Sequence, residues 1–109
     1  MLCLEGADVN TKNNYRETPL QVAAINGKID TIKTLVQFDA DLNVVAGPHN
    51  ETALTAAVVN DYIEVVEYLA DMGADLNIKD GFGRTALYWA IWLNYADIAD
   101  LLEGKAAML

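Results

Sequence analysis

The sequence predicts an all-α solenoid of stacked helix–turn–helix units, and two recurring motifs carry this prediction. The first motif, Ala-Asp-Leu/Val-Asn, occurs at residues 7–10, 40–43 and 74–77. The second motif, Thr-x-Leu, occurs at residues 18–20, 52–54 and 85–87. Copies of each motif follow one another at intervals of 33 or 34 residues. A period of this length is typical of stacked supersecondary units, none of which buries its apolar face alone.

The first unit contains two expected helices. Thr18 suits the N-cap of a first helix that ends at Asn26-Gly27, Pro19 suits the first helical position, and Gln21 completes a capping-box spacing. A second helix is expected from about Ile29 to Phe38, because its apolar residues recur at helical spacing. The unit therefore consists of a turn followed by two short helices.

The same pattern predicts helices at 52–60 and 63–72, and then at 85–94 and 96–103. We divide the single domain, 1–109, into a partial leading unit (1–10), repeat 1 (11–43), repeat 2 (44–77) and repeat 3 (78–109). The loop 44–51 has one residue more than its counterparts and is expected to bulge from the row of turns. The turns that have Arg16 and Asn50 in place of Gly83 are expected to be less regular.

These motifs resemble the ankyrin repeat. The stretches TPLQVAA, TALTAAV and TALYWAI match its Thr-Pro-Leu-His-x-Ala motif, and GADVN, DADLN and GADLN match the segment before its hairpin. The resemblance covers the whole chain and implies paired helices, protruding hairpins and a concave binding surface. The family's histidine is replaced by Gln21, Thr55 and Tyr88, of which only Gln21 is expected to re-form its bond to the threonine hydroxyl.

Composition and residue types argue against several classes of function. The net charge of −9 and only seven Lys and Arg residues disfavour nucleic acid as a partner. The longest apolar run, 87–93, is far too short to cross a membrane, and the N-terminus has no basic residues for a secretory signal. With a single cysteine as well, a cytoplasmic location is expected.

An enzyme is not expected either. The chain has no serine, and its only Cys and His, Cys3 and His49, are 46 residues apart. A structural zinc site needs about four such ligands. Catalytic residues, metal ligands and cofactors are therefore all expected to be absent, with His49 a solvated loop residue.

Acidic residues gather on the predicted second helix of repeat 2. Asp61, Glu64, Glu67 and Asp71 step by three or four residues and are expected to form one ridge. Such a ridge is either a solvated outer face or an electrostatic guide for a basic protein partner.

The family resemblance implies that the partner contacts the hairpin tips and the exposed side of the first helices. The hairpin positions are Lys12, Tyr15, Glu17, Val45, His49, Glu51, Lys79, Phe82 and Arg84. The candidate partner-binding residues are Tyr15, Ile25, Val59, Phe82, Arg84, Trp92 and Leu93. Exposed aromatic residues often mark interfaces. The alternative is that Trp92 and Leu93 pack against the C-terminal tail, and Tyr88 and Trp89 are expected to belong to the core.

The sequence thus favours a non-enzymatic protein-binding module. A second hypothesis is a self-associating scaffold or a piece of a longer array, because neither end of the chain has a polar capping face. Under that hypothesis the chain forms homo-oligomers through apolar residues at its two ends. Those residues are Leu20, Ile29 and Ile32 at one end, and Ile98, Leu101, Leu102 and Leu109 at the other.

Overall fold

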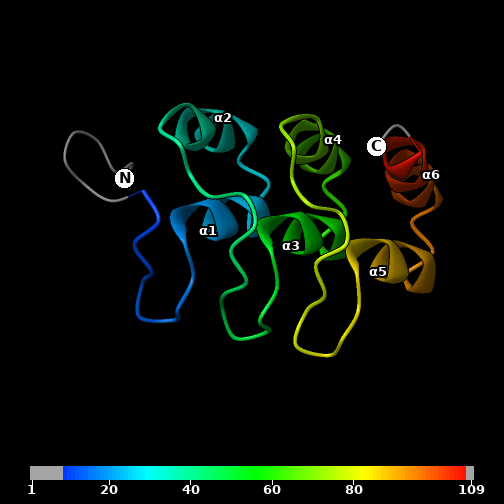
Figure 1. Ribbon diagram of the computed structural model, residues 1–109, viewed down its shortest axis with the longest axis horizontal. Coiled ribbons are helices and arrows are strands. Elements are labelled where there is room, and N and C mark those ends of the chain that lie inside the picture. The colour runs from blue at the N-terminus through cyan, green and yellow to red at the C-terminus, as the bar shows by residue number, and fades with distance from the viewer. Residues whose placement is uncertain (1–8, 108–109) are drawn as a thin grey trace.

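The computed structural model describes residues 9–107, which form six helices arranged as three pairs. The helices are α1 (Pro19–Ile25), α2 (Ile29–Gln37), α3 (Ala53–Val59), α4 (Ile63–Asp71), α5 (Ala86–Trp92) and α6 (Ala96–Ala106). Figure 1 shows α1, α3 and α5 in one row, α2, α4 and α6 in a second row, and three hairpins that project from the first. The predicted all-α solenoid is confirmed. Of the partial leading unit, only Val9 and Asn10 fall within the described residues.

The first helix of each pair begins at a threonine, as the sequence predicts. The hydroxyl oxygens of Thr18, Thr52 and Thr85 accept hydrogen bonds from the backbone N–H groups of Gln21, Thr55 and Tyr88, over 3.1–3.3 Å. The sequence predicted a further bond between the Gln21 side chain and the threonine hydroxyl, and this prediction was wrong. The Thr52 hydroxyl donates to the Thr55 hydroxyl over 3.4 Å, whereas the Gln21 side chain bonds to the next hairpin instead.

The end of α6 differs from the prediction. The helix was expected to stop at Glu103, but it continues through Gly104 to Ala106. Lys105, in its last turn, forms an ion pair with Asp71 of α4. A cation at this position also complements the negative end of the helix dipole.

Two further expectations about local geometry were wrong. Arg16 has a left-handed backbone (φ 63°), as Gly83 does (φ 78°), so the first hairpin makes the same turn as the third. Asp61 also has a left-handed backbone (φ 63°) and lies before α4 rather than on it. The acidic ridge on α4 therefore consists of Glu64, Glu67 and Asp71, all exposed.

The Ala-Asp-Leu-Asn motif links one repeat to the next. The side-chain oxygen of Asn10 accepts a hydrogen bond from the backbone N–H of Asp41, and that of Asn43 accepts one from Asp75, each over 2.8 Å. The Asp75 carboxylate in turn accepts from the backbone N–H of Asn77. These bonds satisfy polar backbone groups that neither a helix nor a strand would satisfy. The motif recurs because each repeat needs the same connection.

The middle hairpin lies in the row rather than bulging from it, contrary to expectation. The Gly47 N–H donates to the carbonyl of Arg16 in the first hairpin over 2.8 Å, and the Gly81 N–H of the third hairpin donates to the carbonyl of His49 over 3.4 Å. Its turn from Gly47 to Asn50 is closed by a bond from the Asn50 N–H to the Gly47 carbonyl, as in the other two hairpins, so the extra residue lies between Asn43 and Gly47, next to an isolated bridge between Ala46 and Glu51. The three hairpins therefore form one connected edge.

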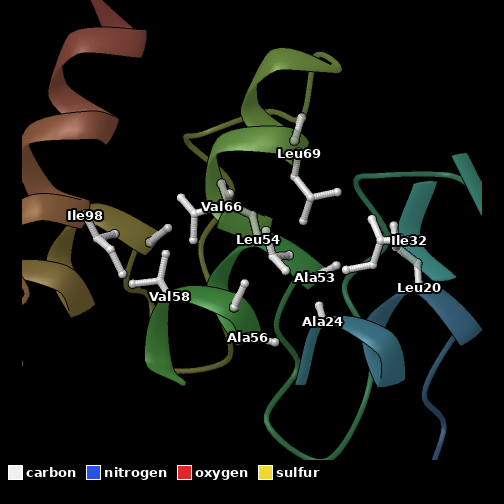
Figure 2. Packing of buried hydrophobic residues seen from close by; sticks show 14 of the residues in the cluster. Leu20, Ala24, Ile32, Ala53, Leu54, Ala56, Val58, Val66, Leu69 and Ile98 are labelled. Carbon is white, nitrogen blue, oxygen red and sulfur yellow. The ribbon is translucent and has the colours of Figure 1, made fainter. Parts of the chain in front are cut away.

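The core runs between the two rows of helices. Figure 2 shows Leu54, Val58 and Val66 among the buried residues of the middle pair, with Ile98 on one side and Leu20 and Ile32 on the other. The expectation that Leu20 and Ile32 lie on an open face was wrong, because they are 2% and 0% exposed. Ile98 and Leu102 are likewise buried. Leu109 lies outside the described residues.

Candidate functional site

A cavity of about 510 Å³ lies between the hairpins and the first helices of the three pairs. Six lining residues belong to the hairpin edge: Glu17, Pro48, His49, Glu51, Asp80 and Phe82. The other five, which belong to the first helices or their ends, are Gln21, Ile25, Val59, Asn60 and Trp89. Apolar walls with a few converging polar groups are typical of binding sites.

The predicted binding residues are only partly brought together by this cavity. Ile25, Val59 and Phe82 line it. Arg84 and Trp92 flank it through contacts with lining side chains, whereas Tyr15 and Leu93 do not line it. Phe82 is 67% exposed and Trp92 is 66% exposed, so neither aromatic side chain is buried by the described residues.

Trp89, expected to be core, is a lining residue that the prediction missed, as are Gln21, Pro48 and Asp80. Its indole N–H donates to the Asp80 carboxylate over 2.7 Å, which fixes the ring against the third hairpin. The side chain is half-buried, and the ring of Trp92 meets it edge-on with centroids 6.1 Å apart. Tyr88 was also expected to be core but is 39% exposed. The third repeat thus presents a cluster of aromatic rings beside the cavity.

Asp80 organises this part of the site through its own hydrogen bonds. One carboxylate oxygen accepts from the backbone N–H groups of Phe82 and Arg84, and the other accepts from Trp89. Burial alone would raise the pKa of Asp80, but the hydrogen bonds from Arg84, Trp89 and Phe82 and the nearby Arg84 charge lower it below its ordinary value. The carboxylate therefore accepts hydrogen bonds on both of its oxygens and serves to hold the turn and the indole ring.

Arg84 stacks on the aromatic cluster instead of facing the cavity. Its guanidinium carbon lies 5.5, 5.0 and 5.3 Å from the ring centroids of Phe82, Tyr88 and Trp89, respectively. Cation–π contacts of this kind contribute about 0.5–1 kcal/mol each at exposed sites. Arg84 thus restrains the rings of Phe82 and Trp89, which line the cavity.

Glu51 has a different environment from Asp80. Its carboxylate accepts no hydrogen bond from the described residues, although its backbone carbonyl accepts one from Gln21. Burial raises the pKa of Glu51 above its ordinary value; His49 opposes this effect, and Asp80 and Glu17 add to it. A half-buried carboxylate without a donor is therefore one of the groups that line the cavity.

This environment gives a pH-dependent prediction for Glu51→Gln. Because the folded-state pKa is raised, the contribution of Glu51 to stability is present below its unfolded pKa and is lost as pH rises through the folded pKa. We expect Glu51→Gln to be more stable than the wild type at neutral pH, with the difference shrinking toward pH 4.5. Urea unfolding of both proteins between pH 4.5 and neutral pH measures this difference in the free energy of unfolding. An equal gain in Glu67→Gln, on the exposed face of α4, would contradict this explanation.

The fold and this site define a helical repeat scaffold with a cavity between its hairpins and first helices. A family model described as "Ankyrin repeats (3 copies)" matches residues 1–80, and the chain belongs to the ankyrin-repeat family. The third helix pair, α5 and α6, lies beyond the matched range and repeats the same arrangement. Ankyrin repeats are generally protein–protein interaction modules and are typically not enzymes.

A curated relative is similar over a short stretch. Alpha-latrocrustotoxin-Lt1a from Latrodectus tredecimguttatus is 53% identical over 36 residues, which are 33% of this chain and 2% of that protein. The chain therefore matches only a small part of this relative. None of the helices in residues 9–107 has the length and apolar character needed to cross a membrane.

Proposed function

We propose that the cavity and its aromatic rim form the surface through which this protein binds a protein partner. The observation that carries the proposal is the exposure of Phe82 and Trp92, about two thirds of each side chain, beside a cavity with apolar walls. Large aromatic side chains left exposed at such a place often become the centre of an interface. The function is binding without catalysis.

A comparison of two double variants tests this proposal. We expect Phe82→Ala plus Trp92→Ala to lower capture of specific partners from native cell extract by about tenfold or more, because central aromatic residues dominate binding energy. Quantitative mass spectrometry of the captured proteins provides the measurement.

The matched control removes exposed apolar side chains elsewhere. Phe38 and Met72 are 45% and 47% exposed at the ends of α2 and α4. The variant Phe38→Ala plus Met72→Ala should keep full capture. Equal loss in both double variants, or no loss in either, would place the binding surface elsewhere.

Self-association is a second candidate, favoured by the exposed side of α5. Ile91 and Tyr88 are 59% and 39% exposed, whereas their counterparts in α3, Val58 and Thr55, are 0% and 1% exposed. The helix α3 is covered by helices of both neighbouring pairs, α1 and α5. The molar mass in solution distinguishes this candidate from binding of a different protein.

A further inference from the structure

We propose that the cavity receives a lysine or arginine side chain from the partner. This inference rests on the proposed binding function and adds the chemistry of the anchoring residue. The charged end of that side chain would lie near Glu17 and Glu51, and its aliphatic stem would lie along the apolar and aromatic walls.

The charges around the cavity support a cationic occupant. Among residues 9–107, Glu17, Glu51 and Asp80 line it and no lysine or arginine does, and Arg84 is stacked on the neighbouring rings. Asp80 is satisfied by its own hydrogen bonds. No donor in the described part of the chain bonds to the Glu51 carboxylate, so a cation next to it would relieve the unfavourable burial of its charge. The net charge of −9 adds long-range attraction for a basic partner.

A second and independent observation comes from Gln21. This lining residue is only 2% exposed, and its amide nitrogen donates to the carbonyls of Ala46 and Glu51 over 2.8 and 2.9 Å. These bonds fix the amide, and its Oε1 atom is left buried without a hydrogen-bond partner among the residues that the structure describes. Buried polar atoms are nearly always paired in folded proteins. The unpaired oxygen leaves a partial negative charge on a residue that lines the cavity, which favours a cationic occupant without a direct bond.

The walls suit the stem of such a side chain. Ile25 and Val59 contribute aliphatic surface, and Phe82 and Trp89 contribute aromatic surface. Lysine and arginine bury their methylene chains along apolar surfaces while their charged ends seek polar groups. Aromatic faces also attract the cation directly. A metal ion is a poorer occupant, because within residues 9–107 no group of three or more His, Cys, Asp or Glu side chains is arranged to hold one.

The test uses short peptides and the indole N–H of Trp89 as the reporter. The probes are an acetylated, amidated Ala-Lys-Ala peptide and the same peptide with norleucine, which keeps the aliphatic stem and lacks the ammonium group. Titration at low ionic strength, followed by ¹⁵N–¹H NMR of the intact chain, measures the affinities. We expect the lysine peptide to shift the Trp89 signal saturably and to bind about fivefold or more tightly than the norleucine peptide.

Two variants distinguish a specific contact with Glu51 from attraction by the protein's overall negative charge. Glu51→Gln should reduce the affinity for the lysine peptide about fivefold, whereas Glu67→Gln, which removes the same charge from the outer face of α4, should leave it nearly unchanged. Equal binding of the norleucine peptide, or equal losses in both variants, would overturn the proposal.

The outcome is distinguishable from a failure of the proposed function. If capture of partners depends on Phe82 and Trp92 but no lysine peptide perturbs Trp89, the cation pocket is wrong and the binding surface stands. If the lysine peptide binds as expected but capture is insensitive to Phe82 and Trp92, the pocket stands and the wider surface is wrong.

Discussion

Replacing Leu54 by alanine is expected to lower the free energy of unfolding by about 3–4 kcal/mol, near the middle of the range for buried leucines. Leu54 is 2% exposed in α3, the helix that contacts α1, α4 and α5. In a repeat protein each unit is stabilised mainly by its neighbours, so a cavity in the middle unit weakens both of its interfaces. Urea unfolding followed by circular dichroism measures the change.

The repeat provides a matched control for this substitution. Leu87 is the counterpart of Leu54 in α5, but it is only partly buried, and α5 packs mainly against α3 and α6. Leu87→Ala is expected to reduce stability by about 1–2 kcal/mol, because less apolar surface returns to water. Equal losses at the two positions would contradict the idea that the middle repeat draws stability from both sides.

The period of the sequence was sufficient to predict the fold. Two motifs in one register located the capping threonines and the helix pairs, because each unit must present the same face to its neighbours. One error occurred where a residue type was taken to decide the geometry of a turn, and another where a helix was expected to end too early. Arg16 adopts the left-handed conformation that the turn requires, and Gly104 stays inside α6 beside the Lys105–Asp71 ion pair. Tertiary context overrides such local preferences.

The candidate site was less predictable, because side-chain direction depends on what fills the neighbouring space. Trp89 occupies the position of Val22 in α1 and Ala56 in α3, and Ala56 is 0% exposed. An indole ring cannot fit the space of a buried alanine, so it turns toward the third hairpin and bonds to Asp80. That difference in size was visible in the sequence. The lack of a partner for Gln21 Oε1 among the described residues was not visible in the sequence, because it depends on the path of the middle hairpin.

Gln21→Glu is expected to destabilise the protein by about 3–5 kcal/mol at neutral pH, as buried charges without a partner do. The amide nitrogen of Gln21 donates to two carbonyl oxygens, those of Ala46 and Glu51. A carboxylate cannot donate, so the substitution would place a buried negative charge against both oxygens, with Glu17 also lining the same cavity. Urea unfolding at neutral and mildly acidic pH provides the measurement.

The dependence of this loss on pH identifies its cause. Burial and the facing oxygens should raise the folded-state pKa of the introduced carboxyl, so its protonated form favours folding and the deficit grows as pH rises through that pKa. When protonated, the group can donate to one of the two carbonyls again. Gln37→Glu makes the same chemical change at an exposed position in α2 and should alter stability by less than about 0.5 kcal/mol. A deficit as small as this control, or one that does not change with pH, would show that Gln21 does not hold the middle hairpin through its amide.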